Sequence, residues 1–510
     1  MPDRSTSRQP EGVSFPRGGD GRRSTQATGR AVFADCVRVV DPTLAARIEH
    51  TNDWRGGYLG PLRDILIAST VSQADANAIA QAGLASMHQR FRFIRGSEEL
   101  SLAEAMADPG PRELGSVEIR GTQAAQPALS LPYRGRRLFG RDLKAQVDDW
   151  VARGIAEPGL ASTLNAILAD PGILDLRDVH VAVLGAGAEM GPTRSLLRWG
   201  ATVHAIDLPG SATWQRLIAI ARSTPGTLRL PITPGADGRL PVVTSGPLHP
   251  EDDASIAALA GVNLLTDAPA IVPWLLGCES PLAIGTYAYA EGALHALLAV
   301  AGDAIVTTAS AQRPDITLAY LATPTDVFAV PAPAVADSRR RWDRRGLAAI
   351  AQTPLRLAGQ FQPNYPESSD LAAGSAIGDA LVPQQGPNYA LAKRIHRWRA
   401  QVAAASGQPV SINLAPATRT RSVIRNRVLA AAYAGADRFG VEVFEPSTST
   451  ALMAALLAYD LRFPSDTTSL QAGQEAFTDR AVHGGLWRTA YAPRSVLGIA
   501  AVLGMFEARS

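Results

Sequence analysis

The sequence predicts an α/β protein whose core is one doubly wound, mostly parallel sheet. After Asp178, short apolar runs rich in β-branched residues alternate with segments of helical periodicity, the pattern of strands joined by crossover helices. One of these units contains a cluster of glycines between its strand and its helix. The chain has 510 residues, of which 46% are hydrophobic, so it can bury a large core in two or three structural units.

Composition narrows the class of protein. Lys and Arg number 49 against 47 Asp and Glu, a net charge of +2, so no general field attracts nucleic acid. The two cysteines, Cys36 and Cys278, lie far apart without ligand spacing, which argues against disulfides or zinc and favours a cytoplasmic location. We expect a small-molecule substrate and no membrane span, because apolar runs stay below ~18 residues; a homo-oligomer is compatible with the sequence.

The first third of the chain divides into a tail and a helical region. Residues 1–30 are polar and lack the apolar segment of a secretion signal, so we expect a disordered tail. Residues 31–175 are predicted to be mainly helical, with an amphipathic helix over 142–154 and another over 160–168. A Gly- and Pro-rich stretch of extended character lies between residues 115 and 140.

The remaining chain is predicted to supply the sheet in two parts, residues 176–330 and residues 376–510, the second ending in C-terminal helices. Between them, residues 331–375 interrupt the alternation and are interpreted as an insertion or lid, with an arginine cluster on a solvated helix face. The seven predicted strands are His180–Leu184, Thr202–Ile206, Val262–Leu265, Leu282–Gly285, Ile316–Leu321, Val410–Leu414 and Arg438–Val443.

The strongest motif is VAVLGAGAEMGPTRSLLRWGATVHAIDLPG, from Val181 to Gly210. A buried strand runs into Gly185, Gly187 and Gly191, and after a helix the second strand ends at Asp207. This is the layout of a Rossmann nucleotide-binding unit, in which glycines let the backbone approach the ligand. A carboxylate after the second strand accepts ribose hydroxyls and repels a 2′-phosphate, which favours NAD over NADP.

The ligand class stays open at this point. Met190 occupies the position where the pattern G-x-G-x-x-G requires its third glycine. S-adenosylmethionine-dependent methyltransferases also combine a Gly-rich first turn with an acid after the second strand. Against them, Val183 stands where many of these enzymes carry an acid.

A second motif suggests proton transfer. Tyr389 and Lys393 are four residues apart in a predicted helix, so both lie on one face and the ammonium can lower the pKa of the phenol. Such a phenol can donate a proton to a carbonyl or accept one from an alcohol. A predicted strand then reaches Asn413, followed by Pro416 and Thr420.

In this order of elements, residues 178 to about 460 resemble the short-chain dehydrogenases. The resemblance implies that Asp207 anchors the adenosine ribose, that Tyr389 transfers the proton and that Lys393 tunes it. It further implies that the loop from Asn413 through Pro416 to Thr420 touches the nicotinamide, that Asp267 contacts the adenine, and that Thr325 or, less favoured, Ser375 holds the substrate oxygen. Asp267 could instead cap the turn before Pro269. The chain departs from the family at Ala417, where glycine is usual, in lacking an Asn-rich turn after the fourth strand, and in its insertion before the tyrosine helix.

We therefore expect a nicotinamide-dependent oxidoreductase acting on a carbonyl or secondary alcohol. The alternatives are a methyltransferase that uses the same glycine turn, and a Rossmann-like scaffold that binds a nucleotide without turnover. Tyr287, Tyr289, Glu291 and His295 could form a polar cluster at a helix start, but the favoured interpretation is a helix with one partly buried histidine. His483 is interpreted as a pocket residue. The sequence contains no H-E-x-x-H, C-x-x-C, G-x-S-x-G or Walker pattern, so it offers no support for zinc hydrolysis or nucleophile-elbow chemistry.

Overall fold

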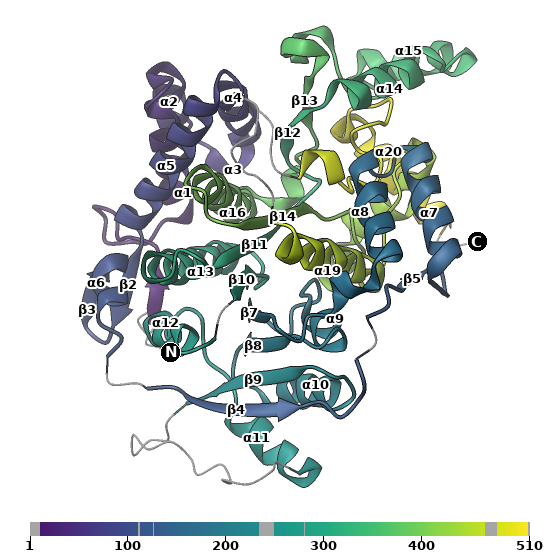
Figure 1. Ribbon diagram of the computed structural model, residues 1–510. Coiled ribbons are helices and arrows are strands. Elements are labelled where there is room, and N and C mark those ends of the chain that lie inside the picture. Colours follow the sequence, from purple (N-terminus) through teal and green to yellow (C-terminus); the bar gives the residue numbers. More distant parts are fainter. Residues whose placement is uncertain are drawn as a thin grey trace, which may run out of the picture.

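A seven-stranded sheet forms the centre of the molecule (Figure 1). The computed structural model describes residues 11–110, 113–125, 127–233, 249–279, 281–464 and 477–507. The strand order is β14-β11-β10-β7-β8-β9-β4, and every neighbouring pair is parallel except β9 and the edge strand β4. The strands are β4 (Gly115–Arg120), β7 (His180–Leu184), β8 (Thr202–Ile206), β9 (Thr227–Ile232), β10 (Leu282–Thr286), β11 (Thr317–Ala322) and β14 (Val410–Leu414). The mixed α/β class with a mostly parallel sheet is confirmed.

Helices cover both faces of this sheet because its central strands are apolar on both sides. Val181 and Val183 of β7 face one hydrophobic core, and Ala182 and Leu184 face the other. The first core is covered by α7 (Gly140–Arg153), α8 (Pro158–Ala169), α9 (Thr193–Arg198), α10 (Ser211–Arg222), α11 (Asp253–Leu259) and α19 (Pro446–Arg462). The second is covered by α12 (Ala268–Leu276), α13 (Ala293–Gln312) and α16 (Pro387–Ala405).

The N-terminal helices add a third layer outside α13 and α16 (Figure 1). They are α1 (Thr25–Arg38), α2 (Pro42–Glu49), α3 (Trp54–Gly57), α4 (Leu59–Ser69), α5 (Gln73–Arg90) and α6 (Leu102–Ala107), with the small sheet β1 (Gly12–Ser14), β2 (Arg92–Arg95) and β3 (Glu98–Ser101). The predicted tail is therefore too long. Residues 1–10 lie outside the described part, but β1 is buried, pairs with β2 and donates from Val13 N to Leu265 O at 2.9 Å.

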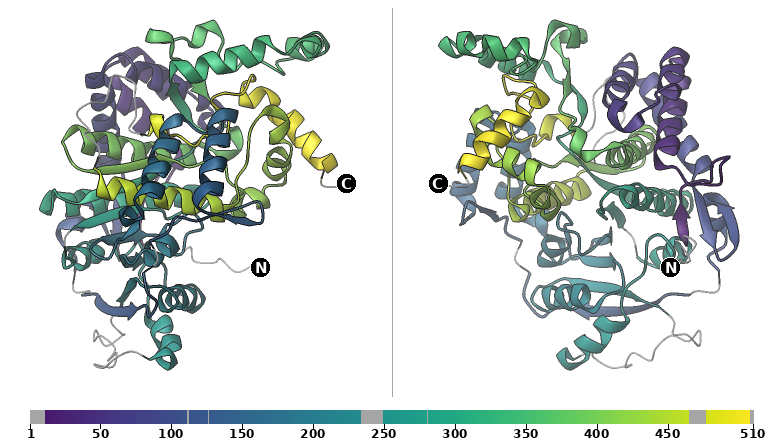
Figure 2. Two further views of the ribbon diagram at one scale, coloured as in Figure 1. Left: turned by 45° about the vertical axis from the view of Figure 1, so that its right-hand side comes forward. Right: turned by 180° about the vertical axis from the view of Figure 1, so that it is seen from behind.

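The insertion after β11 forms a helical extension. Its base is a two-stranded ribbon of β12 (Val327–Val330) and β13 (Ala376–Asp379), and it carries α14 (Ala332–Asp343) and α15 (Leu347–Leu357). Figure 2 shows both helices projecting from the body of the molecule. Within the arginine cluster, Arg340 and Arg341 pair with Asp337 along α14, and Arg339 pairs with Asp370, which follows the short helix at 367–369.

Two predicted strands are wrong. After Ala260, which makes an isolated bridge to Ile232, residues 262–265 form a turn, and Val262 N donates to Asp207 O. Residues 436–439 form a short 3₁₀ helix instead of opening a strand. The third parallel strand is β9, which the sequence hides because Pro231 interrupts its apolar run, and proline is uncommon inside sheets.

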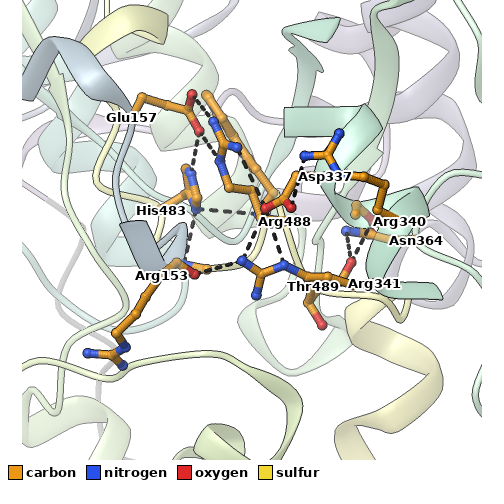
Figure 3. A network of polar contacts seen from close by, with 12 residues as sticks. Arg153, Glu157, Asp337, Arg340, Arg341, Asn364, His483, Arg488 and Thr489 are labelled. Atoms are coloured by element: carbon orange, nitrogen blue, oxygen red, sulfur yellow. Dashed lines mark hydrogen bonds and ion pairs between the residues drawn. The ribbon is translucent and has the colours of Figure 1, made fainter. Parts of the chain in front are cut away.

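The C-terminal segment is anchored to α8 by a buried polar network (Figure 3). Glu157 accepts hydrogen bonds from His483 Nε2 at 3.0 Å and from Arg488 Nε at 2.9 Å, while Arg488 also lies 3.6 Å from Asp337 of α14. Burial alone would raise the pKa of Glu157, but these two partners outweigh it and lower the pKa to about 2. His483 thus holds the fold together and does not line the cavity described below, contrary to the sequence-based interpretation.

The remaining elements complete the shell around the sheet. A hairpin of β5 (Leu131–Tyr133) and β6 (Arg136–Leu138) precedes α7, and α17 (Arg421–Arg425), α18 (Arg427–Ala434) and α20 (Pro493–Glu507) lie beyond β14. Short 3₁₀ helices occupy 171–174, 250–252, 367–369, 372–374, 383–385 and 478–480. Among the described residues, one helix, α13, is long and apolar enough to cross a membrane, and 61% of its apolar window is buried inside the protein.

Candidate active site

A large cavity runs along the carboxyl edge of the sheet. Its volume is about 1110 Å³, and it is lined by residues that follow five parallel strands: Asp207 after β8, Gly185 after β7, Tyr287 after β10, Thr323 after β11 and Pro416 after β14. Between β7 and β10 the chain changes direction across the sheet, since β8 and β9 lie on one side and β11 and β14 on the other. In open α/β sheets, ligands bind in the crevice at such a switch point.

The glycine turn after β7 forms one end of the cavity. Gly185 has φ +92°, and a Cβ there would lie 2.6 Å from Ala288 Cα, so only glycine fits. Gly187 N donates to Asp207 Oδ2 at 2.6 Å, and Leu208 N donates to Oδ1 at 2.8 Å. Because each carboxylate oxygen accepts more than one hydrogen bond, Asp207 keeps acceptor capacity toward the cavity.

Charged side chains surround this turn. Arg216 donates to Gly187 O at 3.4 Å, and Glu189, within the turn, accepts from the backbone N of Arg421 at 2.9 Å. Gly191 does not line the cavity; its N–H donates to Ala188 O at 3.0 Å and closes the turn from behind. Of the three predicted glycines, Gly185 and Gly187 therefore face the cavity.

Tyr389 and Lys393 lie together on the first turns of α16 and line the same cavity. Lys393 Nζ lies 5.9 Å from the centroid of the Tyr389 ring and donates to Leu321 O at 3.2 Å. Burial lowers the pKa of Lys393 to about 8 and raises the pKa of Tyr389. The expected net lowering of the Tyr389 pKa is therefore wrong for this structure, because burial of the phenol outweighs the effect of the neighbouring ammonium.

The hydroxyl partner of Tyr389 is Thr323. The Thr323 side chain hydrogen-bonds the phenol and lies 3.0 Å, oxygen to oxygen, from Thr325 Oγ1, which accepts from Gln385 Nε2 at 2.5 Å. Thr325 also lines the cavity, but it is linked to Tyr389 through Thr323. Ser375 lies outside the cavity, in the insertion, where its hydroxyl donates to Ala372 O at 2.7 Å. It is therefore not positioned to hold a substrate oxygen.

Two histidines that the sequence did not assign to the site line this cavity. His295 stacks on Tyr389 with ring centroids 5.3 Å apart, and His396 stacks on Tyr320 at 5.3 Å. Among the described residues, neither histidine has a hydrogen-bond partner for either ring nitrogen. Burial lowers both pKa values, that of His396 to about 3, so the rings are neutral near pH 7.

A signal for one of these histidines was present in the sequence. His396 follows Tyr389 by seven residues and Lys393 by three, so helical spacing places all three on one face. No comparable spacing connects His295 to α16, because it lies on α13 almost a hundred residues earlier. Its position at the site depends on the packing of α13 against α16, and its interpretation as a purely structural histidine does not account for its place in the cavity.

Two further predicted residues lie outside the cavity, and two lie in it. Asp267 Oδ2 accepts from Asn263 N at 2.9 Å at the start of α12, and Asn413 donates to Asp460 Oδ2 at 2.9 Å within the core. Pro416 and Thr420 line the cavity as expected.

The glycine turn and the pair Tyr389 and Lys393 face a common space. Gly185 packs directly against Ala288, since a Cβ on Gly185 would lie 2.6 Å from Ala288 Cα. The residue after Ala288 is Tyr289, and the centroid of its ring lies 6.4 Å from that of Tyr389. In the described part of the chain, no group of three or more His, Cys, Asp or Glu side chains is arranged to hold a metal ion. No protein-family model and no curated protein matches the chain.

Proposed function

We propose that this protein is a nicotinamide-dependent oxidoreductase that transfers hydride to or from a carbonyl or secondary alcohol. The observation that carries the proposal is that Tyr389, Lys393 and Thr323 share one cavity with the Gly185 turn and Asp207. The cavity thus combines a nucleotide-type turn with a proton-transferring phenol.

The topology supports the same proposal. Numbered along the chain, the parallel strands β9, β8, β7, β10, β11 and β14 have the spatial order 3-2-1-4-5-6, which is that of Rossmann sheets. Thr323 follows the fifth of these strands and Tyr389 lies on the helix between the fifth and sixth. This is the order of elements on which the resemblance to short-chain dehydrogenases rests.

The residues present fit a nicotinamide dinucleotide. The bare backbone at Gly185 and Gly187 permits close approach of a ligand, and Asp207 would hold the adenosine ribose. Arg421 would face the phosphates, since it lines the cavity beside the turn. When bound, the nicotinamide would supply or take up the hydride.

The side chains then act on the proton. In carbonyl reduction, Thr323 and Tyr389 donate hydrogen bonds to the substrate oxygen, and Tyr389 transfers its proton as the alcohol forms. Since burial raises the pKa of Tyr389, the phenol is protonated at neutral pH and ready to act as an acid. The positive charge of Lys393 stabilises the phenolate that remains, and the hydrogen bond from Gln385 to Thr325 positions the threonine pair.

Replacing the phenol tests the proposal. Tyr389→Phe should lower the rate of NADH- or NADPH-dependent reduction of an accepted aldehyde or ketone by roughly 10²- to 10⁴-fold, because it removes the proton donor. Cofactor affinity, measured by calorimetric titration, should change little. Tyr459→Phe, on α19 outside the cavity, is the matched control. A Tyr389→Phe enzyme with full activity would exclude this mechanism.

The methyltransferase alternative has one observation in its favour. Glu189 places a carboxylate in the turn, where it would repel a pyrophosphate but not S-adenosylmethionine. Melting temperatures with NADH, NADPH and S-adenosylmethionine separate the two functions, because a ligand that binds the native state stabilises it by RT ln(1 + [L]/Kd). Stabilisation by S-adenosylmethionine alone would replace the oxidoreductase proposal, and stabilisation by none of the three would favour a different ligand.

A further inference from the structure

We infer that the substrate carries a long, uncharged aliphatic chain, which lies in an apolar arm of the cavity formed by Leu429, Tyr433, Phe439, Tyr491, Val496 and Leu497. The inference rests on the proposed function for the position of the reacting carbonyl at Tyr389. The class of ligand itself follows from the lining of the arm.

One part of the cavity lining differs in chemistry from the rest. It comes from α18, residues 436–439 and α20, which contact one another, and its lining residues carry no charge and only hydroxyls as polar side-chain groups. The charged lining residues Glu189, Asp207, Lys393 and Arg421 belong to other segments. A surface of this kind pairs with an apolar ligand, because it offers no counter-charge to an ionic one and few partners to a polar one.

The apolar arm adjoins the proposed reacting group. Tyr433 of the arm lines the same cavity as Tyr389, and the two phenols interact electrostatically. The whole cavity of about 1110 Å³ exceeds the ~300–1000 Å³ of ordinary ligand pockets. After a cofactor occupies the end near Asp207, the arm remains as space for the rest of the substrate.

The walls of the arm are close-packed. On α18 and α20, a Cβ at Gly504 would lie 2.0 Å from Ala431 O, and one at Gly435 would lie 2.2 Å from Ala500 O, so the two helices are in direct backbone contact. At the far end, the ring of Tyr491 lies 6.0 Å from that of Phe439, and its hydroxyl accepts from Gln352 Nε2 at 2.9 Å. These contacts hold together the elements that carry the apolar lining residues.

Chain length provides the first measurement. With straight-chain aldehydes of four to sixteen carbons, kcat/KM should rise about fourfold for each methylene until the arm is filled, as expected for burial of apolar surface. Binding of the matching 1-alkanols, measured by displacement of the neutral dye Nile red, should follow the same trend and needs no turnover. A kcat/KM and an alkanol affinity that are independent of chain length, or that fall with it, would overturn the inference.

Filling the arm provides the second measurement. Leu497→Trp should weaken binding of 1-dodecanol at least tenfold and shift the preferred aldehyde to shorter chains, and Leu429→Phe, from the facing helix, should act in the same direction. Leu503→Trp is the matched control, since Leu503 is exposed on the same helix and does not line the cavity. Circular dichroism identifies any variant that fails to fold, and the remaining one then decides. An unchanged dodecanol affinity in the folded variant, or an equal loss in Leu503→Trp, would overturn the inference.

These measurements separate the inference from the proposed function. If alkanols bind with the expected length dependence but no aldehyde is reduced with NADH or NADPH, the oxidoreductase proposal fails and the ligand class stands. If aldehydes are reduced without length dependence and alkanols do not bind, the ligand class is wrong and the oxidoreductase proposal stands.

Discussion

At the scale of single residues, Lys393 shows how a candidate site opposes stability. Its pKa is lowered to about 8 by burial, from an unfolded value of 10.5. Below pH 8 the lysine is charged in both states, and the folded protein bears the full cost of burying the charge, up to roughly 3 kcal/mol. Between pH 8 and 10.5 the unfolded state binds more protons, so stability rises with pH across this window.

We therefore predict that Lys393→Met stabilises the protein at pH 7 while slowing turnover. The gain should be about 1–3 kcal/mol, less than the full desolvation term because Leu321 O loses its donor. Urea unfolding of wild type and variant at pH 7 and at pH 10.5 measures it, and the difference should shrink at the higher pH. A variant less stable than wild type at pH 7 would contradict the prediction.

Asp207 sets a second expectation at this scale. Its carboxylate lines the cavity beside the glycine turn and would face a 2′-phosphate, so wild type should bind NADH more tightly than NADPH. Asp207→Asn should narrow this preference in fluorescence titrations of both cofactors. Asp253→Asn, on α11 away from the cavity, provides the comparison. Tighter binding of NADPH by wild type would show that Asp207 does not hold the ribose.

At the scale of secondary-structure elements, the buried parallel strands were the most predictable part of the fold. Runs such as 181–184 and 282–285 carry no polar side chain because both faces are covered, and this signal is local. The segments 262–265 and 438–443 also contain clustered apolar residues but belong to no strand, so the local pattern misidentified them. Pairing partners are a long-range property that a local pattern does not contain.

The same distinction applies to the candidate site. Gly185, Asp207, Tyr389 and Lys393 were identified because short spacings connect them in pairs along the chain. Thr323 was passed over in favour of Thr325, two residues on, since only packing shows which hydroxyl reaches Tyr389. The sequence thus indicates which turns and helices carry the chemistry, while the choice of partner across elements requires the fold.

A buried ion-pair cluster fixes the helix that carries Tyr389. Asp326, which directly precedes β12 at the base of the insertion, accepts from Arg394 and Arg397 of α16, each at 2.7 Å. All three side chains are about 5% exposed. Asp326→Ala should lower the free energy of unfolding by about 3–5 kcal/mol, because it leaves two buried guanidinium groups without this carboxylate. In the same denaturation experiment, Asp64→Ala, which breaks the exposed pair with Arg47, should cost at most about 1 kcal/mol. Equal losses in the two variants would contradict this assignment.

At the scale of the whole molecule, two buried carboxylates join the layers. Asp303 of α13 accepts from Arg399 of α16 and from His88 of α5, which connects the N-terminal layer to the sheet. Glu157 connects α8 to the C-terminal segment through His483 and Arg488 (Figure 3). For both carboxylates burial alone would raise the pKa, but their cationic partners outweigh it and lower the pKa.

These carboxylates predict how the whole protein responds to acid. Glu157 has a folded pKa of about 2 against about 4.5 when unfolded, so its stabilisation is complete above pH 4.5 and is lost as pH falls through 2. The difference corresponds to roughly 3 kcal/mol at pH 7. Glu157→Gln should therefore be less stable than wild type by up to that amount at pH 7, and the two proteins should converge toward pH 2. Urea unfolding monitored by tryptophan fluorescence between pH 2 and 7 measures both. A constant difference across this range would mean that the loss comes from packing rather than from the charge of Glu157.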